Sequence, residues 1–381
     1  MNKIVYMDNA ATSFPKPPEV HEFAQYISQT RGVNASRGNY SPAMEVSRMI
    51  DDTRRKCLEL LHAKNKVLAF CSSATEALNT VIQGLDYAPI QWVYISPFEH
   101  NAMLRPIYSL QKMRNFDIMQ LAVSPTPLRY DVDEILRQFE QNPPDLVLLT
   151  HASNVCGLIA PFEEIFAAAK RHGAITVLDM SQTAGLVDTN ISSADVDYAV
   201  FAGHKTMMGP FGVAGLVLKR GDSLRPLLYG GTGTNSALHD MPAALPERLE
   251  AGSHNIQAIA GLSAAVQWIQ QISMKIIRER ETDLTRQLKQ LLRSYPNIRI
   301  VGNNEGVSIV SCVFDGYSPD EIGLILSRRD IAVRTGLHCA PLAHEALGTA
   351  PAGTVRFSLS CRNSEDELEL LKAALDEIAQ T

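Results

Sequence analysis

Three short apolar runs, each followed by polar residues, constrain the fold of this chain more than any other feature. The runs cover residues 145–150, 174–179 and 198–201. They are spaced by about one strand and one connection each, and a helical pattern over 162–172 fills the first interval. Apolar runs that alternate with helices are typical of a parallel sheet covered by helices. We therefore predict an α/β fold with a mainly parallel central sheet and helices on both faces.

Polar residues recur at the same end of these predicted strands. Asn154 follows the first run, Asp179 ends the second, and Lys205 follows the third. Ligands of open α/β sheets bind outside the carboxyl ends of the strands. We therefore expect the three side chains to converge on one crevice.

Lys205 is the most informative of these residues. Burial lowers the pKa of a lysine because it disfavours the ammonium form, and the neutral amine can attack a carbonyl to form a Schiff base. If Lys205 is buried after its strand, it is suited to carry an aldehyde cofactor. Without other information, an exposed loop lysine is the better interpretation of Lys205, since lysines are seldom buried. Motifs elsewhere in the chain are needed to distinguish these two interpretations of Lys205.

Bulk properties exclude several classes of protein. A chain of 381 residues exceeds one usual core, so we expect two domains. The net charge of −6 gives no general attraction to nucleic acid. Asp8 comes too early for a signal peptide, and no apolar run is long enough to span a bilayer. We expect a cytoplasmic protein with no nucleic-acid or membrane partner.

The cysteines do not form a recognisable framework. The six lie scattered along the chain with no Cys-x-x-Cys pair, at positions 57, 71, 156, 312, 339 and 361. This spacing supports neither a disulfide scaffold nor a zinc site, and we expect no metal.

The domains are expected to divide near the start of a long helical pattern at residue 256. We predict a large domain over 14–258 and a small domain formed by 1–13 and 259–381. Strands at 298–301, 306–314 and 354–359 with helices at 320–328 and 364–379 predict that the small domain is an α/β unit.

Two further strand ends carry candidate ligand-binding residues. A strand at 66–70 precedes a helix that opens at Ala74 and Thr75, and helix N-termini bind phosphate. An ordinary helix cap is the alternative there. A strand at 92–96 is followed by His100.

Together these motifs resemble the pyridoxal-phosphate-dependent cysteine desulfurases, specifically the group II desulfurase and selenocysteine lyase branch of the class V aminotransferase-like, fold-type I enzymes. The agreement extends over nearly the whole chain. The motifs include Asp8-Asn9-Ala10-Ala11-Thr12, Asn34-x-x-Arg37-Gly38, Ala74-Thr75-Glu76-Ala77, Glu99-His100, Ser153-Asn154, Asp179-x-x-Gln182, Gly203-His204-Lys205, Arg334-x-Gly336-x-His338-Cys339 and Val355-Arg356-Phe357-Ser358. Each motif is short, but their shared order and spacing favour the cofactor-bearing reading of Lys205.

The resemblance implies a site for pyridoxal 5'-phosphate. Lys205 would hold the cofactor and move the Cα proton, and Asp179 would keep the pyridine nitrogen protonated. His100 would stack on the ring, with Asn154 and Gln182 at the ring hydroxyl. The full implied cofactor set is Ala74, Thr75, His100, Asn154, Asp179, Gln182, His204, Lys205, Gly231 and Thr232. In this set Thr75, the Ala74 backbone and His204 would bind phosphate, and Gly231 and Thr232 would come from the other subunit of a homodimer.

The resemblance also implies a substrate site and a nucleophile. Arg356 would bind the substrate carboxylate through two hydrogen bonds. The implied helpers are Ala11, Asn34, Arg37 and Asn154. Cys339 would attack the sulfur of L-cysteine, which releases alanine and leaves a persulfide for a protein sulfur acceptor, as in iron–sulfur cluster assembly. Lys205, Cys339 and His100 are the predicted catalytic residues.

Three departures from the family pattern leave the exact substrate open. Leu337 and Tyr40 stand where relatives carry histidine, and Ala202 stands where they carry serine. A selenocysteine lyase or a cysteine sulfinate desulfinase would use the same scaffold, and an epimerase-like relative would not need Cys339. Outside this chemistry, a thiol hydrolase that uses Cys339 and His338 and a catalytically silent sulfur-carrier scaffold are the alternatives.

Overall fold

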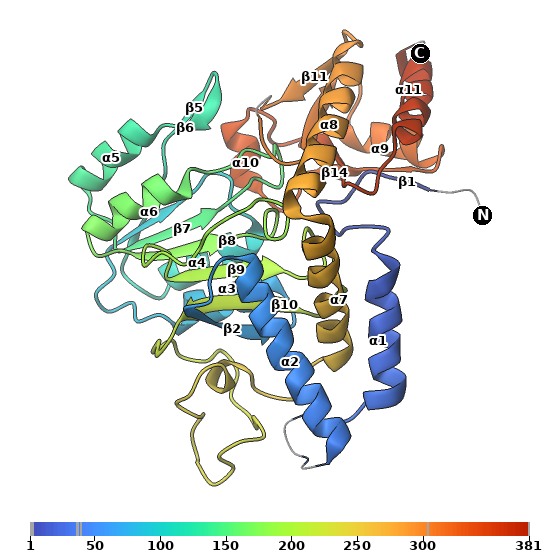
Figure 1. Cartoon of the computed structure of the whole chain (residues 1–381). Helices are drawn as coiled ribbons and strands as arrows, with labels where there is room; N and C mark the ends of the chain where they lie inside the picture. The colour runs from blue at the N-terminus through green and yellow to red at the C-terminus, as the bar shows by residue number, and fades with distance from the viewer. Residues whose placement is uncertain (1–3, 36–37, 39, 303–304, 380–381) are drawn as a thin grey trace.

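A seven-stranded sheet organises the larger part of the chain (Figure 1). The computed structural model describes residues 4–35, 38, 40–302 and 305–379. Strand order is β2-β10-β9-β8-β7-β3-β4. β10 runs antiparallel to both neighbours, and the other pairs are parallel. The strands are Lys66–Cys71 (β2), Trp92–Ile95 (β3), Asp117–Gln120 (β4), Leu146–Thr150 (β7), Ile175–Asp179 (β8), Tyr198–Ala202 (β9) and Ala214–Lys219 (β10). The predicted mainly parallel α/β sheet is confirmed.

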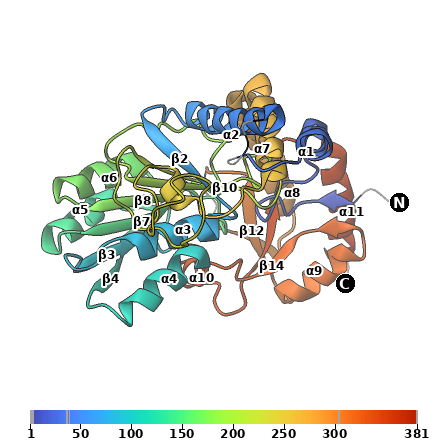
Figure 2. The ribbon, with the colours of Figure 1, turned by 90° about the horizontal axis from the view of Figure 1, so that it is seen from below.

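Helices cover both faces of this sheet (Figure 2). Side chains alternate along the strands, so that Val177 of β8 joins one apolar core and Leu178 joins the other. One core includes α3 (Ala74–Gly84) and α4 (Asn101–Gln111). The other includes α2 (Ser41–Leu60), α5 (Val132–Gln141), α6 (Phe162–Arg171) and α7 (Ile256–Ile272). The continuous apolar runs in the sequence reflect this burial on two sides.

The C-terminal part forms a second, smaller α/β unit. Its antiparallel sheet has the order β11-β12-β15-β14. These strands are Ile298–Val301 (β11), Ile309–Phe314 (β12), Arg334–Gly336 (β14) and Thr354–Ser358 (β15), and the helices are Met274–Arg293 (α8), Pro319–Ser327 (α9), Pro341–Ala346 (α10) and Glu365–Ala379 (α11). β1 (Val5–Tyr6), at the start of the chain, pairs with β13 (Ile331–Ala332). Outside the two sheets, β5 (Val123–Pro125) pairs with β6 (Leu128–Tyr130), and α1 (Pro18–Arg31) packs on α7.

We propose a domain boundary between α7 and α8. It gives two domains close to those predicted, a large one from residue 14 and a small one that includes residues 1–13. α7 packs on α1 and α2, and its buried residues belong to the core of the large sheet. α8 instead packs on β11 and β12. This packing favours a boundary at Ser273, whose side chain caps α8, over one at residue 258.

A buried carboxylic acid ties segments of the small unit together. Glu281 of α8 accepts hydrogen bonds from the Ser308 hydroxyl (2.8 Å) and from the Cys361 backbone N–H (3.1 Å). Burial raises the pKa of Glu281 to about 7, because the loss of hydration disfavours the charged form. The carboxyl group is therefore protonated in the folded protein at pH values where it is ionised in the unfolded chain.

We expect this acid to make stability dependent on pH. Since its folded pKa lies above the unfolded value of 4.5, stability falls as the pH rises from about 4.5 to about 7 and then levels off. The difference corresponds to about 3 kcal/mol. Glu281→Gln should remove this loss and raise the free energy of unfolding at pH 8, measured by urea denaturation. Glu279→Gln, on the exposed side of the same helix, is the matched control. An unchanged pH profile in Glu281→Gln would contradict the assignment.

Candidate active site

A cavity of about 250 Å³ lies at the carboxyl ends of β7, β8 and β9, where the sequence predicts a crevice. The small unit closes it through β14, β15 and the loop before α10. Predicted site residues that line it are Ala11, Ala74, Thr75, His100, Asn154, Asp179, Gln182, His204, Lys205, Cys339 and Arg356. Residues separated by more than 300 positions in the sequence therefore meet in one cavity.

Lys205 is held in a tight turn directly after β9. Gly203 opens this turn, and a Cβ atom at this position would lie 2.6 Å from the Val213 carbonyl oxygen, so that a side chain does not fit. Burial lowers the pKa of Lys205, while the nearby Asp179 carboxylate opposes this shift. A larger fraction of neutral amine, the nucleophilic form, is the result. The side chain of Lys205 is partly buried and lines the cavity.

Residues 12–16, part of the segment before α1 that we call the N-terminal arm, hold the peptide group that precedes Lys205. The carbonyl oxygen of His204 accepts hydrogen bonds from Thr12 Oγ1 (2.9 Å), the Ser13 backbone N–H (3.1 Å) and Lys16 Nζ (3.1 Å). Burial lowers the pKa of Lys16 to about 8. These contacts fix the main chain from which the Lys205 side chain extends.

Asp179 lies at the end of β8, beside Thr150 at the end of β7. Its Oδ1 atom accepts hydrogen bonds from the Ser181 backbone N–H (2.9 Å) and hydroxyl (2.6 Å). Both bonds fall on Oδ1, which leaves Oδ2 to accept from a ligand. Gln182 is anchored nearby, since its amide nitrogen donates to the Ala10 carbonyl at 2.9 Å.

His100 is the N-cap of α4 and faces the same cavity. Its Nδ1 atom accepts a hydrogen bond from the Ala102 backbone N–H at 3.0 Å. Burial, followed by the charge of Lys205, lowers the pKa of His100 to about 4. The ring is therefore neutral at physiological pH, with its proton on Nε2.

The N-terminus of α3 and His204, where the sequence predicts phosphate binding, lie together at the cavity. Ser73 caps α3 by accepting from the Glu76 N–H at 3.1 Å, and the N–H groups of the first helical residues have no partner inside the helix. His204 stacks on Phe211 with ring centroids 4.5 Å apart. Burial lowers the pKa of His204 to about 4, so its ring is neutral. A helix N-terminus with an adjacent imidazole suits an anion.

Arg356 lies at the other end of the cavity on β15, almost completely buried. It donates to the Asn154 carbonyl (2.9 Å) and to Asp8 Oδ1 (2.7 Å). Asp8 also lies 3.5 Å from Arg334, which lines the cavity as well. Neither Asp8 nor Arg334 is among the predicted site residues, although both lie within the sequence motifs given above. Two arginines at one end of the cavity suit a substrate carboxylate.

Cys339 lies on an exposed turn between β14 and α10. The preceding His338 is buried, and its Nε2 atom is 2.9 Å from Thr354 Oγ1. Burial lowers the pKa of His338 to about 2, so this imidazole is a poor base. This arrangement argues against a hydrolase that uses His338 to activate Cys339.

The cavity fits the predicted pyridoxal phosphate. Four buried polar atoms of its lining have no hydrogen-bond partner among the described residues: Asn154 Oδ1, His204 Nδ1, His338 Nδ1 and Arg356 Nε. Buried polar atoms are usually paired, so these atoms indicate a polar ligand. An amine, a carboxylate and a helix N-terminus around one cavity match an aldehyde, a ring nitrogen and a phosphate.

Three predicted site residues lie away from this cavity within the chain. Asn34 lies 3.4 Å from Ser253 Oγ, and Gly231 and Thr232 line a separate hollow in an exposed loop. Arg37 lies outside the described residues. Their roles at the site stay predictions.

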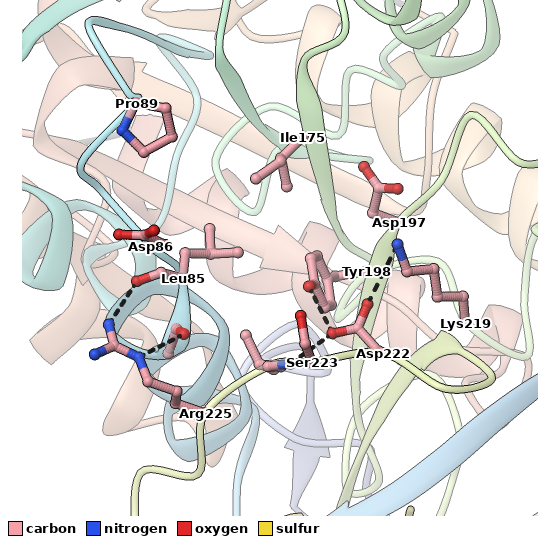
Figure 3. A pocket seen from close by; sticks show the side chains of 12 residues that line it. Leu85, Asp86, Pro89, Ile175, Asp197, Tyr198, Lys219, Asp222, Ser223 and Arg225 are labelled. Atoms are coloured by element: carbon pink, nitrogen blue, oxygen red, sulfur yellow. Dashed lines mark hydrogen bonds and ion pairs between the residues drawn. The ribbon is translucent and has the colours of Figure 1, made fainter.

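A larger cavity of about 540 Å³ lies at the opposite ends of the strands (Figure 3). Its charged groups are already engaged. Asp222 accepts from the Tyr198 hydroxyl at 3.0 Å, and Arg225 donates to the Leu85 carbonyl at 2.8 Å. These contacts join β9 and α3 to the segment after β10, which is a structural role.

Comparison with known proteins agrees with this geometry. Residues 5–371 match the family model described as Aminotransferase class-V. A protein named "Probable cysteine desulfurase" from Aeropyrum pernix is 33% identical, over 99% of this chain and 95% of its own length. A protein of the same name from Methanothermobacter thermautotrophicus is 29% identical, over 98% of this chain and 94% of its own.

Solved structures of cysteine desulfurases are similar to this chain over nearly its whole length. The apo structure of a cysteine desulfurase from Thermococcus onnurineus has a TM-score of 0.91 and 28% identity, covering 100% of this chain and 95% of that one. The cysteine desulfurase CsdA from Escherichia coli has a TM-score of 0.86 and 25% identity, covering 99% and 95% of the two chains. The likeness extends over both sheets.

Proposed function

This chain belongs to the aminotransferase class-V family of pyridoxal-phosphate-dependent enzymes, and from that membership we propose that it is a cysteine desulfurase. The observation that carries the proposal is the meeting of Lys205, Asp179, Arg356 and Cys339 around one cavity. The lysine and the aspartate suit the cofactor, the arginine suits an amino-acid carboxylate, and the thiol suits sulfur transfer.

Each residue supports one part of the reaction. Bound pyridoxal phosphate supplies an electron sink for the substrate Cα. Lys205 would hold the cofactor and move the Cα proton, which its lowered pKa favours. Asp179 would accept a hydrogen bond from the ring nitrogen through Oδ2. Arg356 would orient the substrate carboxylate, with Arg334 beside it.

Cys339 would carry out the sulfur transfer. Its thiolate attacks the sulfur of L-cysteine, and a sulfur–sulfur bond forms as the carbon–sulfur bond breaks. The electron pair of the broken bond remains on the substrate carbon, and a proton added there completes L-alanine. A persulfide is left on Cys339. An exposed turn is suited to pass this sulfur on.

We test this proposal with two cysteine variants. Cys339→Ala should lower alanine release from L-cysteine by at least about 100-fold, because the nucleophile is lost. Cys361→Ala, which changes a partly exposed cysteine that does not line the cavity, is the matched control and should behave as wild type. The measurements are alanine and sulfide production, with the yellow colour of bound cofactor recorded for every variant.

Other outcomes point to other functions. A protein that takes up no cofactor would refute the assignment. A coloured protein whose alanine output ignores Cys339→Ala would indicate a selenocysteine lyase or a sulfinate desulfinase.

We further propose a homodimer, in which Gly231 and Thr232 of one subunit complete the phosphate site of the other. Their exposed loop lies outside the cavity of its own chain, which supports this arrangement. Exposed Phe211, Leu228 and Tyr229 precede Gly231 and Thr232 in the sequence and provide apolar surface.

We propose a protein sulfur acceptor, a role in sulfur supply such as iron–sulfur cluster assembly, and a cytoplasmic location. None of the six cysteines, all of which lie in the described part of the chain, forms a disulfide, which suits a reducing compartment. No helix within the described ranges is long and apolar enough to cross a membrane.

A further inference from the structure

The turn that carries Cys339 adopts an unusual backbone conformation. We refer to residues 336–340 as the cysteine loop. His338 and Cys339 have φ angles of 49° and 58°, in the left-handed region that residues other than glycine rarely adopt. Two consecutive residues of this kind are costly, and such a conformation persists only where surrounding contacts hold it. The contacts around the loop therefore decide where the thiol lies.

Two hydrogen bonds hold the carbonyl groups of these strained residues from outside the loop. The Asn154 side-chain amide donates to the His338 carbonyl at 2.7 Å. The Asn101 backbone N–H donates to the Cys339 carbonyl at 2.7 Å. Both bonds are short for N–H donors.

One donor lines the cofactor cavity, and the other directly follows a residue that lines it. Asn154 lines the cavity, and its Oδ1 atom is buried without a hydrogen-bond partner in the described structure. Asn101 is the first residue of α4, directly after His100, whose ring lines the same cavity. The contacts that hold the loop therefore come from one residue that lines the cavity and from the neighbour of another.

Asn154 is also tied to the substrate end of the site. Its backbone carbonyl accepts a hydrogen bond from Arg356 at 2.9 Å. One residue thus contacts the arginine predicted to bind the substrate carboxylate, the cysteine loop and the cavity. Because an amide that accepts a hydrogen bond at its oxygen becomes a stronger donor at its nitrogen, a ligand at Oδ1 strengthens the bond to the His338 carbonyl.

We infer that the cofactor and the cysteine loop are coupled through Asn154 and the first turn of α4, so that binding of the cofactor holds the Cys339 thiol in place. The inference rests on the proposed function and deepens it. An empty site leaves the strained loop more weakly held, so the reactive thiol is positioned only when the cofactor is present. Coupling of this kind acts in both directions, so loosening the loop also weakens cofactor binding.

Hydrogen exchange of the loop amides tests this coupling. The protein is compared without cofactor and with pyridoxal phosphate fixed on Lys205 by borohydride reduction, so that occupancy is equal in all variants. The cofactor should slow exchange in residues 336–340 of wild type about tenfold. In Asn154→Ala this slowing should fall below about twofold, because the hydrogen bond from Asn154 to the His338 carbonyl is lost.

A second pair of variants tests the other contact. Asn101→Pro removes the N–H donor at a helical position where proline is well tolerated, and the preceding His100 already has an extended ψ of 152°. With cofactor fixed in both proteins, the amides of the cysteine loop should exchange faster in Asn101→Pro than in wild type. Asn101→Ala keeps the backbone N–H and should match wild type.

The outcomes separate the coupling from the proposed function. If fixed cofactor slows loop exchange equally in wild type, Asn154→Ala and Asn101→Pro, the coupling is wrong, while the enzyme assignment stands. If borohydride fixes no cofactor on Lys205 of wild type, both are overturned.

Discussion

Lys205→Ala is expected to lower the turnover of L-cysteine on the order of 10⁴-fold. The change removes the amine that holds the cofactor covalently and the group that moves the Cα proton, and proton transfer alone contributes up to about 10⁴. The fold should survive, because alanine leaves the Gly203 turn and the clamp on the His204 carbonyl intact. The measurements are alanine production and the mass of the peptide that contains position 205, in variant and wild type, after borohydride reduction.

The matched control is Lys275→Ala, which changes an exposed lysine on α8. It should retain wild-type turnover and the cofactor mass on Lys205. Normal turnover in Lys205→Ala, or fixed cofactor on another lysine of the wild-type protein, would refute the role of Lys205.

Asp179→Asn is expected to lower turnover about 10³-fold, the size usual for loss of a preorganised electrostatic contact. Asparagine has the same shape and can still accept from Ser181, so the structural contacts remain. It lacks the negative charge that keeps a ring nitrogen protonated. Loss of this charge should also change the absorption spectrum of the bound cofactor, and a purely structural role would not.

Asp188→Asn serves as the control, since this exposed aspartate pairs with His62 and neither residue lines the cavity. Its turnover and spectrum should equal those of wild type. An Asp179→Asn variant with a normal spectrum and normal turnover would show that the carboxylate does not contact the ring.

The central sheet and one side of the cavity follow from the sequence because they depend on local patterns. The run at residues 145–150 predicts β7, found at Leu146–Thr150, since a strand buried on both faces is continuously apolar. Asp179 and Lys205 follow from the rule that ligands bind at carboxyl ends of parallel strands. By contrast, α4 is not predicted, because Pro106 lies within it and interrupts the helical pattern.

Contacts between distant segments could not be predicted in this way. The clamp of Thr12 and Lys16 on the His204 carbonyl joins residues almost 200 positions apart, and no local pattern marks it. The partners of Asp8, which are Arg334 and Arg356, are also set by the fold alone. The left-handed backbone at His338 and Cys339 is uncommon for residues other than glycine, and no local sequence pattern predicts it.

The N-terminal arm has a consequence for synthesis of the protein on the ribosome. Thr12 and Lys16 are translated long before their partner His204, and Asn9 and Ala10 long before their partner Ser358. The pocket around Lys205 can therefore be completed only after residue 358 has been made. Late closure of this kind delays cofactor capture until the strands of both sheets have been translated.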